Sequence, residues 1–443
     1  GTLSAPLRHS PRFQGQGYTP WQPVTRTGEP VRQGPYSRPE DVAPVRWRAP
    51  QPIALMSHRT ISLVALAALA FAPAAYAQQA QDSTPPLNPA TDPLLRGFQW
   101  RSIGPVGQGG RVDDIAVVEG DPSTFYVGFA TAGIWKKENN GVTFTPIFDT
   151  HSTHSIGDIA IAPSNPDILY VGTGEANNRQ SSSFGDGMYK STDAGKTFQQ
   201  IGLRETQSIA RVVVHPTNPD IVWVAANGHL FGPNEERGVY RSDNGGRSWT
   251  KTLSIDENTG ATDLVIHPRN PNVLFAAMYA RRRTSWGFAS GSPESGIYKS
   301  TDGGKSWNRV TGGGLPAGTM GRVALDISRS NPDVIYAQIE VAPDKEPVMV
   351  AQQGRGGGNN DDDDDENLPP DPASSGIWRS ANGGATWTFM SNQNVRPMYF
   401  SQIRVDPTNE NTVFVAGVQA YKSGGAGKTW SGRGIAHGLS EGR

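Results

Sequence analysis

Charged side chains recur at matching places in this sequence, where they could bind or cleave a polar ligand. Asp158, Arg211 and Asp263 each lie five residues before a proline that belongs to a turn. Two carboxylates that flank one bond can hydrolyse a glycoside, and arginine binds carboxylate groups. The same charges could equally pair with one another in an internal salt-bridge network along the channel. Equivalent positions and neighbouring polar loops add further residues, so the predicted ligand-binding set is Arg111, Asp114, Asp158, Glu175, Asn177, Arg211, His229, Asp263, Arg281 and Arg322.

Two repeated motifs indicate the elements that position these residues. GIYKSTDGGKSW (296–307) returns at 187–198, 238–249 and 376–387, with weaker copies at 133–144 and 419–430. Upstream of each copy, two apolar runs flank a turn of the Asn-Pro-Asp type, which predicts a hairpin. Each repeat therefore predicts four short strands, which we letter A to D, with one turn between A and B and one between C and D.

Four antiparallel strands in roughly 40–50 residues are typical of a β-propeller blade. Six copies lie between residues 112 and 430, so the sequence predicts an all-β propeller with six visible blades. FQWRSI (98–103) resembles an outer strand that would close the ring with the last blade. The chain is therefore expected to carry six blades of a seven-bladed ring, or to close with six. Because an open propeller leaves strand edges unpaired, we expect this chain to be a truncated product.

The repeated box itself predicts a structural turn. Asp193 and Asp302 can accept hydrogen bonds from the backbone of their own loops, and Gly195 and Gly304 permit positive φ. A catalytic site repeated six times is implausible, so chemistry is expected on the opposite rim, where the B–C and D–A loops lie; we call it the B–C rim. The aromatic residues that follow the box are expected to pack between blades: Trp249, Trp307 and Trp387.

The box, Ser-x-Asp-x-Gly-x-Thr/Ser-Trp/Phe, resembles the Asp-box or BNR repeat. The stretches 100–111, 171–192 and 229–240 are similar to an exported bacterial group of WD40/YVTN/BNR-like proteins, the sortilin N-terminal and xyloglucanase-like "glycosyl hydrolase" group. The resemblance runs from residue 98 to about residue 430. It implies a propeller, export from the cytoplasm, and a peptide or polysaccharide ligand.

Whether the chain is an enzyme stays open on these residues. In the xyloglucanase type, one catalytic Asp follows strand B of the first blade and the other belongs to a second propeller. The matching position here is Ala130, so neither carboxylate carries over. The leading hypothesis is a propeller that binds a peptide or glycan on the B–C rim. The alternatives are a glycoside hydrolase with Asp158, Glu175 or Asp263 as acid and base, and a scaffold whose function lies in missing blades.

The first 97 residues differ from the repeats. Residues 1–55 are rich in Pro, Arg and Gln without an apolar period, which predicts a disordered extension upstream of the true start. Residues 56–77 combine a basic stretch, an apolar run and Ala-Tyr-Ala, which predict a signal peptide cleaved after Ala77 and hence a secreted or periplasmic protein. A linker (78–97) precedes the propeller (98–443), which carries a low-complexity insertion at 343–373.

Composition argues against several other classes. A formal net charge of −1 provides no electrostatic footprint for nucleic acid. Without cysteine there is neither a disulfide nor a thiolate metal site, and no His cluster has zinc spacing. The apolar run of the signal is too short to span a bilayer in the mature chain. We therefore predict no metal, no cofactor and no membrane span.

Overall fold

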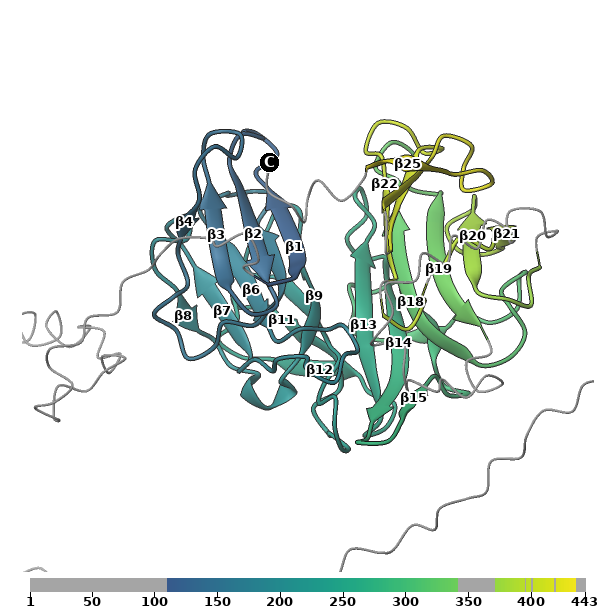
Figure 1. Ribbon diagram of the computed structural model, residues 1–443, viewed down its shortest axis with the longest axis horizontal. Coiled ribbons are helices and arrows are strands. Elements are labelled where there is room, and N and C mark those ends of the chain that lie inside the picture. The colour runs from purple at the N-terminus through teal and green to yellow at the C-terminus, as the bar shows by residue number, and fades with distance from the viewer. Residues whose placement is uncertain (1–109, 342–370, 395, 400, 418–419, 436–443) are drawn as a thin grey trace, which may run out of the picture. The chain divides into compact units, whose positions relative to one another are not determined.

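The computed structural model describes residues 110–341, 371–394, 396–399, 401–417 and 420–435 (Figure 1). The chain divides into two units, Gly1–Asp82 and Ser83–Arg443, and every described residue belongs to the second. The predicted extension, signal peptide and linker, the FQWRSI segment, and residues 343–370 of the predicted insertion all lie outside the described residues.

The strands of each repeat pair in chain order into one antiparallel sheet, as the motifs predict. The first sheet contains β1 (Val112–Val117), β2 (Phe125–Phe129), β3 (Gly133–Lys137) and β4 (Thr145–Pro146). The second contains β5 (Ile156–Ile161), β6 (Leu169–Thr173), β7 (Met188–Ser191) and β8 (Gln199–Gln200). After the short 3₁₀ helix η1 (Arg204–Thr206), the third contains β9 (Ile209–Val214), β10 (Val222–Ala226), β11 (Gly238–Ser242) and β12 (Thr250–Leu253).

The fourth sheet departs from the four-strand prediction. It contains β13 (Thr259–Ile266), β14 (Leu274–Arg283), β16 (Gly296–Ser300) and β17 (Asn308–Arg309), and β15 (Phe288–Ser290) pairs with the far end of the long β14. The fifth contains β18 (Met320–Ile327), β19 (Ile335–Val341), β20 (Gly376–Ser380) and β21 (Thr388–Ser391). The sixth contains β22 (Gln402–Val405), β23 (Val413–Ala416), β24 (Ala420–Ser423) and β25 (Ser431–Ile435).

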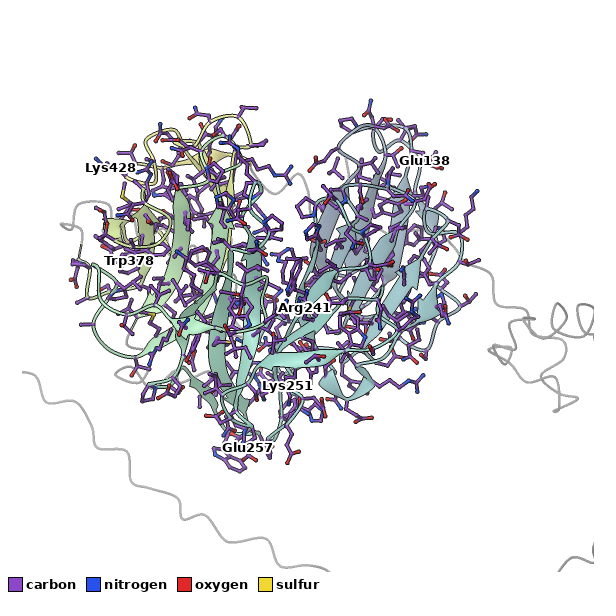
Figure 2. All side chains as sticks on the ribbon, turned by 180° about the vertical axis from the view of Figure 1, so that it is seen from behind. Glu138, Arg241, Lys251, Glu257, Trp378 and Lys428 are labelled. Carbon is purple, nitrogen blue, oxygen red and sulfur yellow. The ribbon has the colours of Figure 1, made fainter. Side chains whose placement is uncertain are left out.

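Apolar side chains fill the spaces between successive sheets (Figure 2). Trp378 of β20, labelled in Figure 2, is fully buried and belongs to the same cluster as Phe275 of β14. The first strands contact one another in chain order, β1 with β5, then β9, β13, β18 and β22. This arrangement confirms the predicted all-β propeller with six visible blades, and a seventh sheet is not among the described residues.

The Asp-box carboxylates form hydrogen bonds within their own turns. Asp302 accepts hydrogen bonds from the backbone N–H of Ser306 (3.0 Å) and from the Ser306 hydroxyl (2.6 Å). The hydroxyl of Ser306, followed by its backbone N–H, holds the pKa of Asp302 well below its usual range. The backbone N–H of Gly304 donates to the Ser300 hydroxyl at 2.9 Å, and Asp193 repeats the pattern in the second blade. These carboxylates are engaged by their own turns.

Gly304 is required by both conformation and space. Its φ is +77°, and a Cβ there would lie 2.4 Å from the indole nitrogen of Trp223 in the preceding blade. The indole of Trp249 likewise contacts the preceding blade, because it donates to the carbonyl of Ile201 at 2.8 Å. Each turn therefore locks its blade against the previous one.

Candidate functional site

A carboxylate on the first strand of four sheets joins that sheet to the next. In each case one oxygen accepts a hydrogen bond from a backbone N–H on the first strand of the following sheet, and we call these contacts the carboxylate clips. They connect Asp114 to Ile159 (3.0 Å), Asp158 to Val212 (2.7 Å), Asp263 to Leu325 (2.8 Å) and Asp326 to Val405 (2.7 Å). The clips hold adjacent first strands in register, because strands of different sheets share no backbone ladder.

Arg211 makes the link where the third sheet has no carboxylate. Its guanidinium donates to Asp158 at 2.8 Å and to Asp263 at 3.1 Å. Burial alone would lower the pKa of Arg211, but the two carboxylates raise it above its ordinary value. Burial raises the pKa of Asp158 to about 7 against the opposing effect of Arg211. These three predicted ligand residues form an internal ion-pair network, and a ligand role for them stays a prediction.

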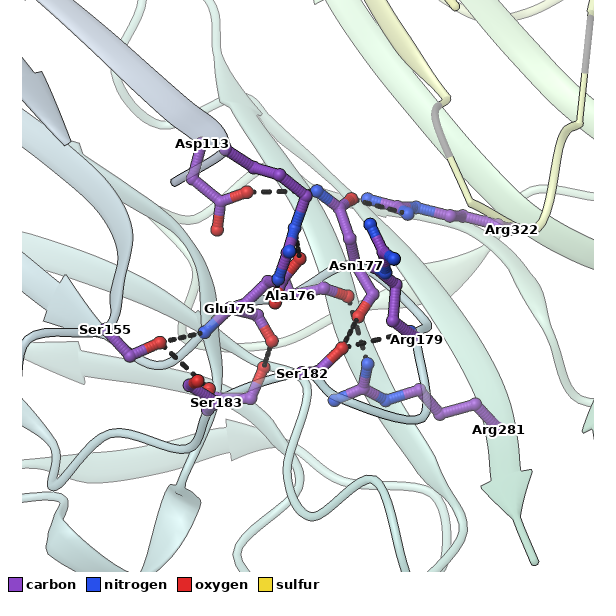
Figure 3. Close-up of polar contacts among 12 residues, drawn as sticks. Asp113, Ser155, Glu175, Ala176, Asn177, Arg179, Ser182, Ser183, Arg281 and Arg322 are labelled. Carbon is purple, nitrogen blue, oxygen red and sulfur yellow. Dashed lines mark hydrogen bonds and ion pairs between the residues drawn. The ribbon is translucent and has the colours of Figure 1, made fainter. Parts of the chain in front are cut away.

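The B–C loop of the second blade, residues 174–187, reaches across the ring (Figure 3). Glu175 is buried and accepts two hydrogen bonds from Arg111, at 2.8 and 2.5 Å. Asn177 lies between two blades: it donates to Asp113 of β1 at 3.0 Å and accepts from Arg322 of β18 at 3.0 Å. One loop of the second blade thus bonds to the first and the fifth.

Asn178 continues this reach toward the fourth blade. Its amide nitrogen donates to the Tyr279 hydroxyl at 3.2 Å and to the carbonyl of Met398 at 2.6 Å. Its amide oxygen accepts from Arg281 at 2.8 Å, and Arg281 also donates to the carbonyls of Ala176 (3.0 Å) and Gly228. Arg281, which is 1% exposed, therefore holds two adjacent rim loops in place.

These loops surround a pocket of about 320 Å³ on the B–C rim. It is lined by Glu175, Arg281 and loop residues of the second and third blades, among them Phe184 and Phe231, which are 73% and 50% exposed. A second pocket, of about 570 Å³, lies on the opposite rim beside the Asp-box turns and is lined by Lys190 and residues 244–247 among others. The rim pocket is the one that predicted site residues help to form.

The structure gathers most of the predicted residues into two groups. Asp114, Asp158, Arg211 and Asp263 belong to the clips, and the others lie at the B–C rim. Among these, His229 belongs to the B–C loop of the third blade, with its ring nitrogen 3.0 Å from the carbonyl oxygen of Glu205. Sequence reasoning missed the further rim and clip residues Asp113, Arg237 and Asp326, and it recognised Asn178 and Arg283 only as polar residues of the B–C loops.

Two observations bear on metals and membranes. Nowhere in the described ranges do three His, Asp or Glu side chains converge closely enough to hold a metal ion. No helix in the described part of the chain is long and apolar enough to cross a membrane.

Comparison with known families supports the resemblance expected from the boxes. The family described as Sortilin-Vps10 (sortilin, neurotensin receptor 3) matches residues 132–255 and 186–315. Residues 132–315 of this chain are thus similar to that family. The matched residues include the loop from Glu175 to Arg179, the Asp-boxes of the second to fourth blades, and the buried Arg281.

The curated relatives that this chain resembles are distant and much longer. A xyloglucanase from a Paenibacillus species is 24% identical over 240 residues, which are 48% of this chain and 22% of that protein. The xyloglucanase Xgh74A of Acetivibrio thermocellus is 23% identical over 248 residues, 48% of this chain and 27% of that protein. The matched stretch thus spans about a quarter of each relative.

Solved structures agree on the fold. An ancestral GH74 enzyme superposes with a TM-score of 0.52 at 19% identity, covering 75% of this chain and 40% of that chain. The GH74 xyloglucanase from Xanthomonas campestris gives a TM-score of 0.50 at 16% identity, and the superposition covers 72% of this chain and 45% of that chain. At this level of identity the likeness concerns the fold alone and supports the propeller architecture.

Asp113 generates a pH-dependent prediction. Its Oδ2 is buried without a hydrogen-bond partner in the described structure, and burial, followed by the nearby Glu175, raises its pKa well above the ordinary value. A carboxyl with a raised folded pKa stabilises the native state at low pH, and this contribution is lost as the pH rises through that pKa. The Asp113→Asn variant should therefore have a free energy of unfolding about 1–2 kcal/mol higher than that of the wild type at pH 8, and little different at pH 4. Urea unfolding at the two pH values measures this difference.

The control is Asp114→Asn, one residue along the strand, because the Asp114 carboxylate has a backbone partner in Ile159. This variant should show no gain at pH 8. Equal stability of wild type and Asp113→Asn across pH 4–8 would mean that the Asp113 carboxylate is compensated in a way that its contacts do not reveal.

Proposed function

We propose that this protein is an exported Asp-box propeller that binds a glycan or a peptide on its B–C rim. The observation that carries this proposal is the rim pocket, whose walls are loops of different blades held by the buried Arg281. On the opposite rim, the Asp-box carboxylates bond to their own turns. Recognition is thereby favoured on one rim and structural support on the other.

The lining of the pocket favours a glycan. The Ser183 hydroxyl and the Gln207 side-chain amide make no hydrogen bond within the described structure, so both are free to bond to sugar hydroxyls. Phe184 and Phe231 offer exposed aromatic faces of the kind that stack on sugar rings. Relatives named as xyloglucanases support the same ligand class.

Binding is favoured over hydrolysis by the state of the candidate carboxylates. Asp158 and Asp263 share Arg211, and each is 3% exposed. Glu175, 2% exposed, is held by Arg111. A general acid or base must reach the bond it acts on, and none of these groups is free to do so without breaking an ion pair.

We propose further that a seventh blade covers β1. Ile115 on β1 is 49% exposed, whereas Ile159 and Leu264, at the same register on β5 and β13, are 5% and 1% exposed. Those two residues pack in the clusters that join their sheets to the preceding ones, and no described sheet precedes β1. Val112 and Val117 of β1 are similarly exposed, so an additional sheet would bury an apolar face.

Export is proposed from residues 56–77, which lie outside the described residues. N-terminal sequencing of the secreted protein should find a mature chain that begins at Gln78. A mature chain that retains residues 56–77 would contradict export by this signal.

The rim assignment predicts the effect of removing the exposed aromatic faces. Phe184→Ala and Phe231→Ala should each weaken ligand binding at least about tenfold while Tm stays unchanged, because both side chains are largely exposed. The ligand is first found by screening the mature protein on glycan and peptide arrays, and its affinity is then measured by isothermal titration calorimetry.

The matched control is Arg247→Ala in the pocket on the Asp-box rim, which should bind normally. Loss of binding in the Arg247 variant, with normal binding in both Phe variants, would place the site on the opposite rim and contradict the proposal.

The seventh blade predicts the effect of a charge on β1. In the full-length secreted protein, Ile115→Glu should lower the free energy of unfolding by at least about 2 kcal/mol, because it would bury an unpaired carboxylate. Val142→Glu, at a position that is 79% exposed in the same blade, is the control and should be near neutral. If both variants unfold like the wild type, no sheet covers β1.

A further inference from the structure

Four arginines are buried at the B–C rim without a carboxylate partner. Arg237, Arg281, Arg283 and Arg322 are at most 3% exposed, and among the described residues none of their guanidinium groups makes an ion pair with a carboxylate. Their partners are backbone carbonyls and side-chain amides. Arg322 has the carboxylates of Asp113, Asp263 and Glu340 in its surroundings. Buried charges in proteins are normally paired, so Arg237, Arg281 and Arg283, which we call the arginine cluster, carry positive charge without a paired anion.

Arg281 brings this charge to the pocket. Both terminal nitrogens donate to loop oxygens, but its Nε is buried without a partner. Burial, followed by the neighbouring Arg237, lowers the pKa of Arg281 well below its ordinary value, and burial lowers that of Arg237 to about 10. The surroundings therefore disfavour the charged form, as expected for guanidinium groups that lack an anion.

The other charge in the pocket wall is already neutralised. Glu175 lines the pocket beside Arg281, but its carboxylate is paired with Arg111 at 2.8 and 2.5 Å. The free hydrogen-bonding groups of the wall are those of Ser183 and Gln207. The pocket thus combines net positive charge at its wall with a free hydroxyl and a free amide.

The pocket suits a ring better than an extended peptide. The backbone N–H of Gly185 donates to Gln207 and that of Gly228 donates to Ser208, so these edges do not offer a ladder to an added strand. Phe184 and Phe231 stand exposed at the pocket, where they can pack on the apolar face of a sugar.

We infer that the rim pocket binds an acidic sugar residue, with its carboxylate beside Arg281 and its ring against Phe184 and Phe231. This inference rests on the proposed function, and it adds that the glycan carries uronate groups. A carboxylate at this place would compensate the arginine cluster and form charge-assisted hydrogen bonds.

The test compares an acidic trisaccharide with its uncharged methyl ester. Calorimetry on the mature protein measures binding of trigalacturonic acid and of its trimethyl ester, which keeps the rings and removes the carboxylate charges. The acid should bind at least about tenfold more tightly, and this advantage should shrink as salt is added. Equal affinity for the two, or tighter binding of the ester, would overturn the inference.

Two variants locate the binding without disturbing the fold. Gln207 has a φ of +56°, which glycine adopts without strain, so Gln207→Gly removes the amide and should leave Tm unchanged. Both Gln207→Gly and Phe231→Ala should weaken binding of the acid at least about fivefold, and Arg247→Ala on the opposite rim should not. Unchanged binding in the first two variants would overturn the assignment to this pocket.

Failure of this inference can be told apart from failure of the proposed function. If acid and ester bind equally and Phe231→Ala weakens both, the rim binds a neutral glycan and only the acidic class is wrong. If neither sugar binds but a peptide does, in a manner lost with Phe231→Ala, the rim function stands and the acidic sugar is excluded. If every ligand found binds equally to the two rim variants and the wild type, both proposals fail.

Discussion

Every sheet of this protein has two apolar faces, and each face must be covered by a neighbouring sheet. Five clusters of buried side chains join the six sheets in succession, and the exposed Ile115 marks the face that lacks a neighbour among the described sheets. Apolar packing brings sheets together but does not fix how far one slides along another. That register comes from directional contacts: the carboxylate clips on the inner strands and the Asp-box turns on the outer ones.

The clips explain why several charged residues that could have bound a ligand instead join adjacent sheets. Asp263 uses one carboxylate oxygen for Leu325 and the other for Arg211 and for its own strand. Asp158 divides its oxygens in the same way between Val212 and Arg211. Such bonds are strong, but burying the carboxylate works against them, as the raised pKa of Asp158 shows. The clips therefore contribute register more than net stability.

The sequence allowed the repeated parts to be predicted and not the parts that occur once. Period, turn residues and alternating apolar runs recur in each blade, so the strands and the role of Asp302 followed from local rules. The contact of Asn177 with Arg322 joins residues 145 positions apart in the sequence, and no local pattern encodes it. When the fourth and fifth sheets are aligned by their strand pairing, Asp326 lies two residues after the position on β18 that corresponds to Asp263. A search at the position of Asp263 in each repeat therefore does not find the carboxylate of Asp326. The strand β15 depends on the length of β14, which extends beyond the repeat.

The loops of the two rims satisfy their backbone polar groups in different ways, and this difference accounts for where binding is expected. Loops on either rim must satisfy their backbone carbonyls and N–H groups. The Asp-box turns do so within five residues, so they are short, alike and self-contained. The B–C loops are longer and differ between blades, and buried arginines such as Arg281 and Arg237 bind their carbonyls from a distance. Holding loops in this way places positive charge beneath a surface pocket, where it remains uncompensated until an anion binds. The feature that orders the rim is thus the same one that gives it a preference among ligands.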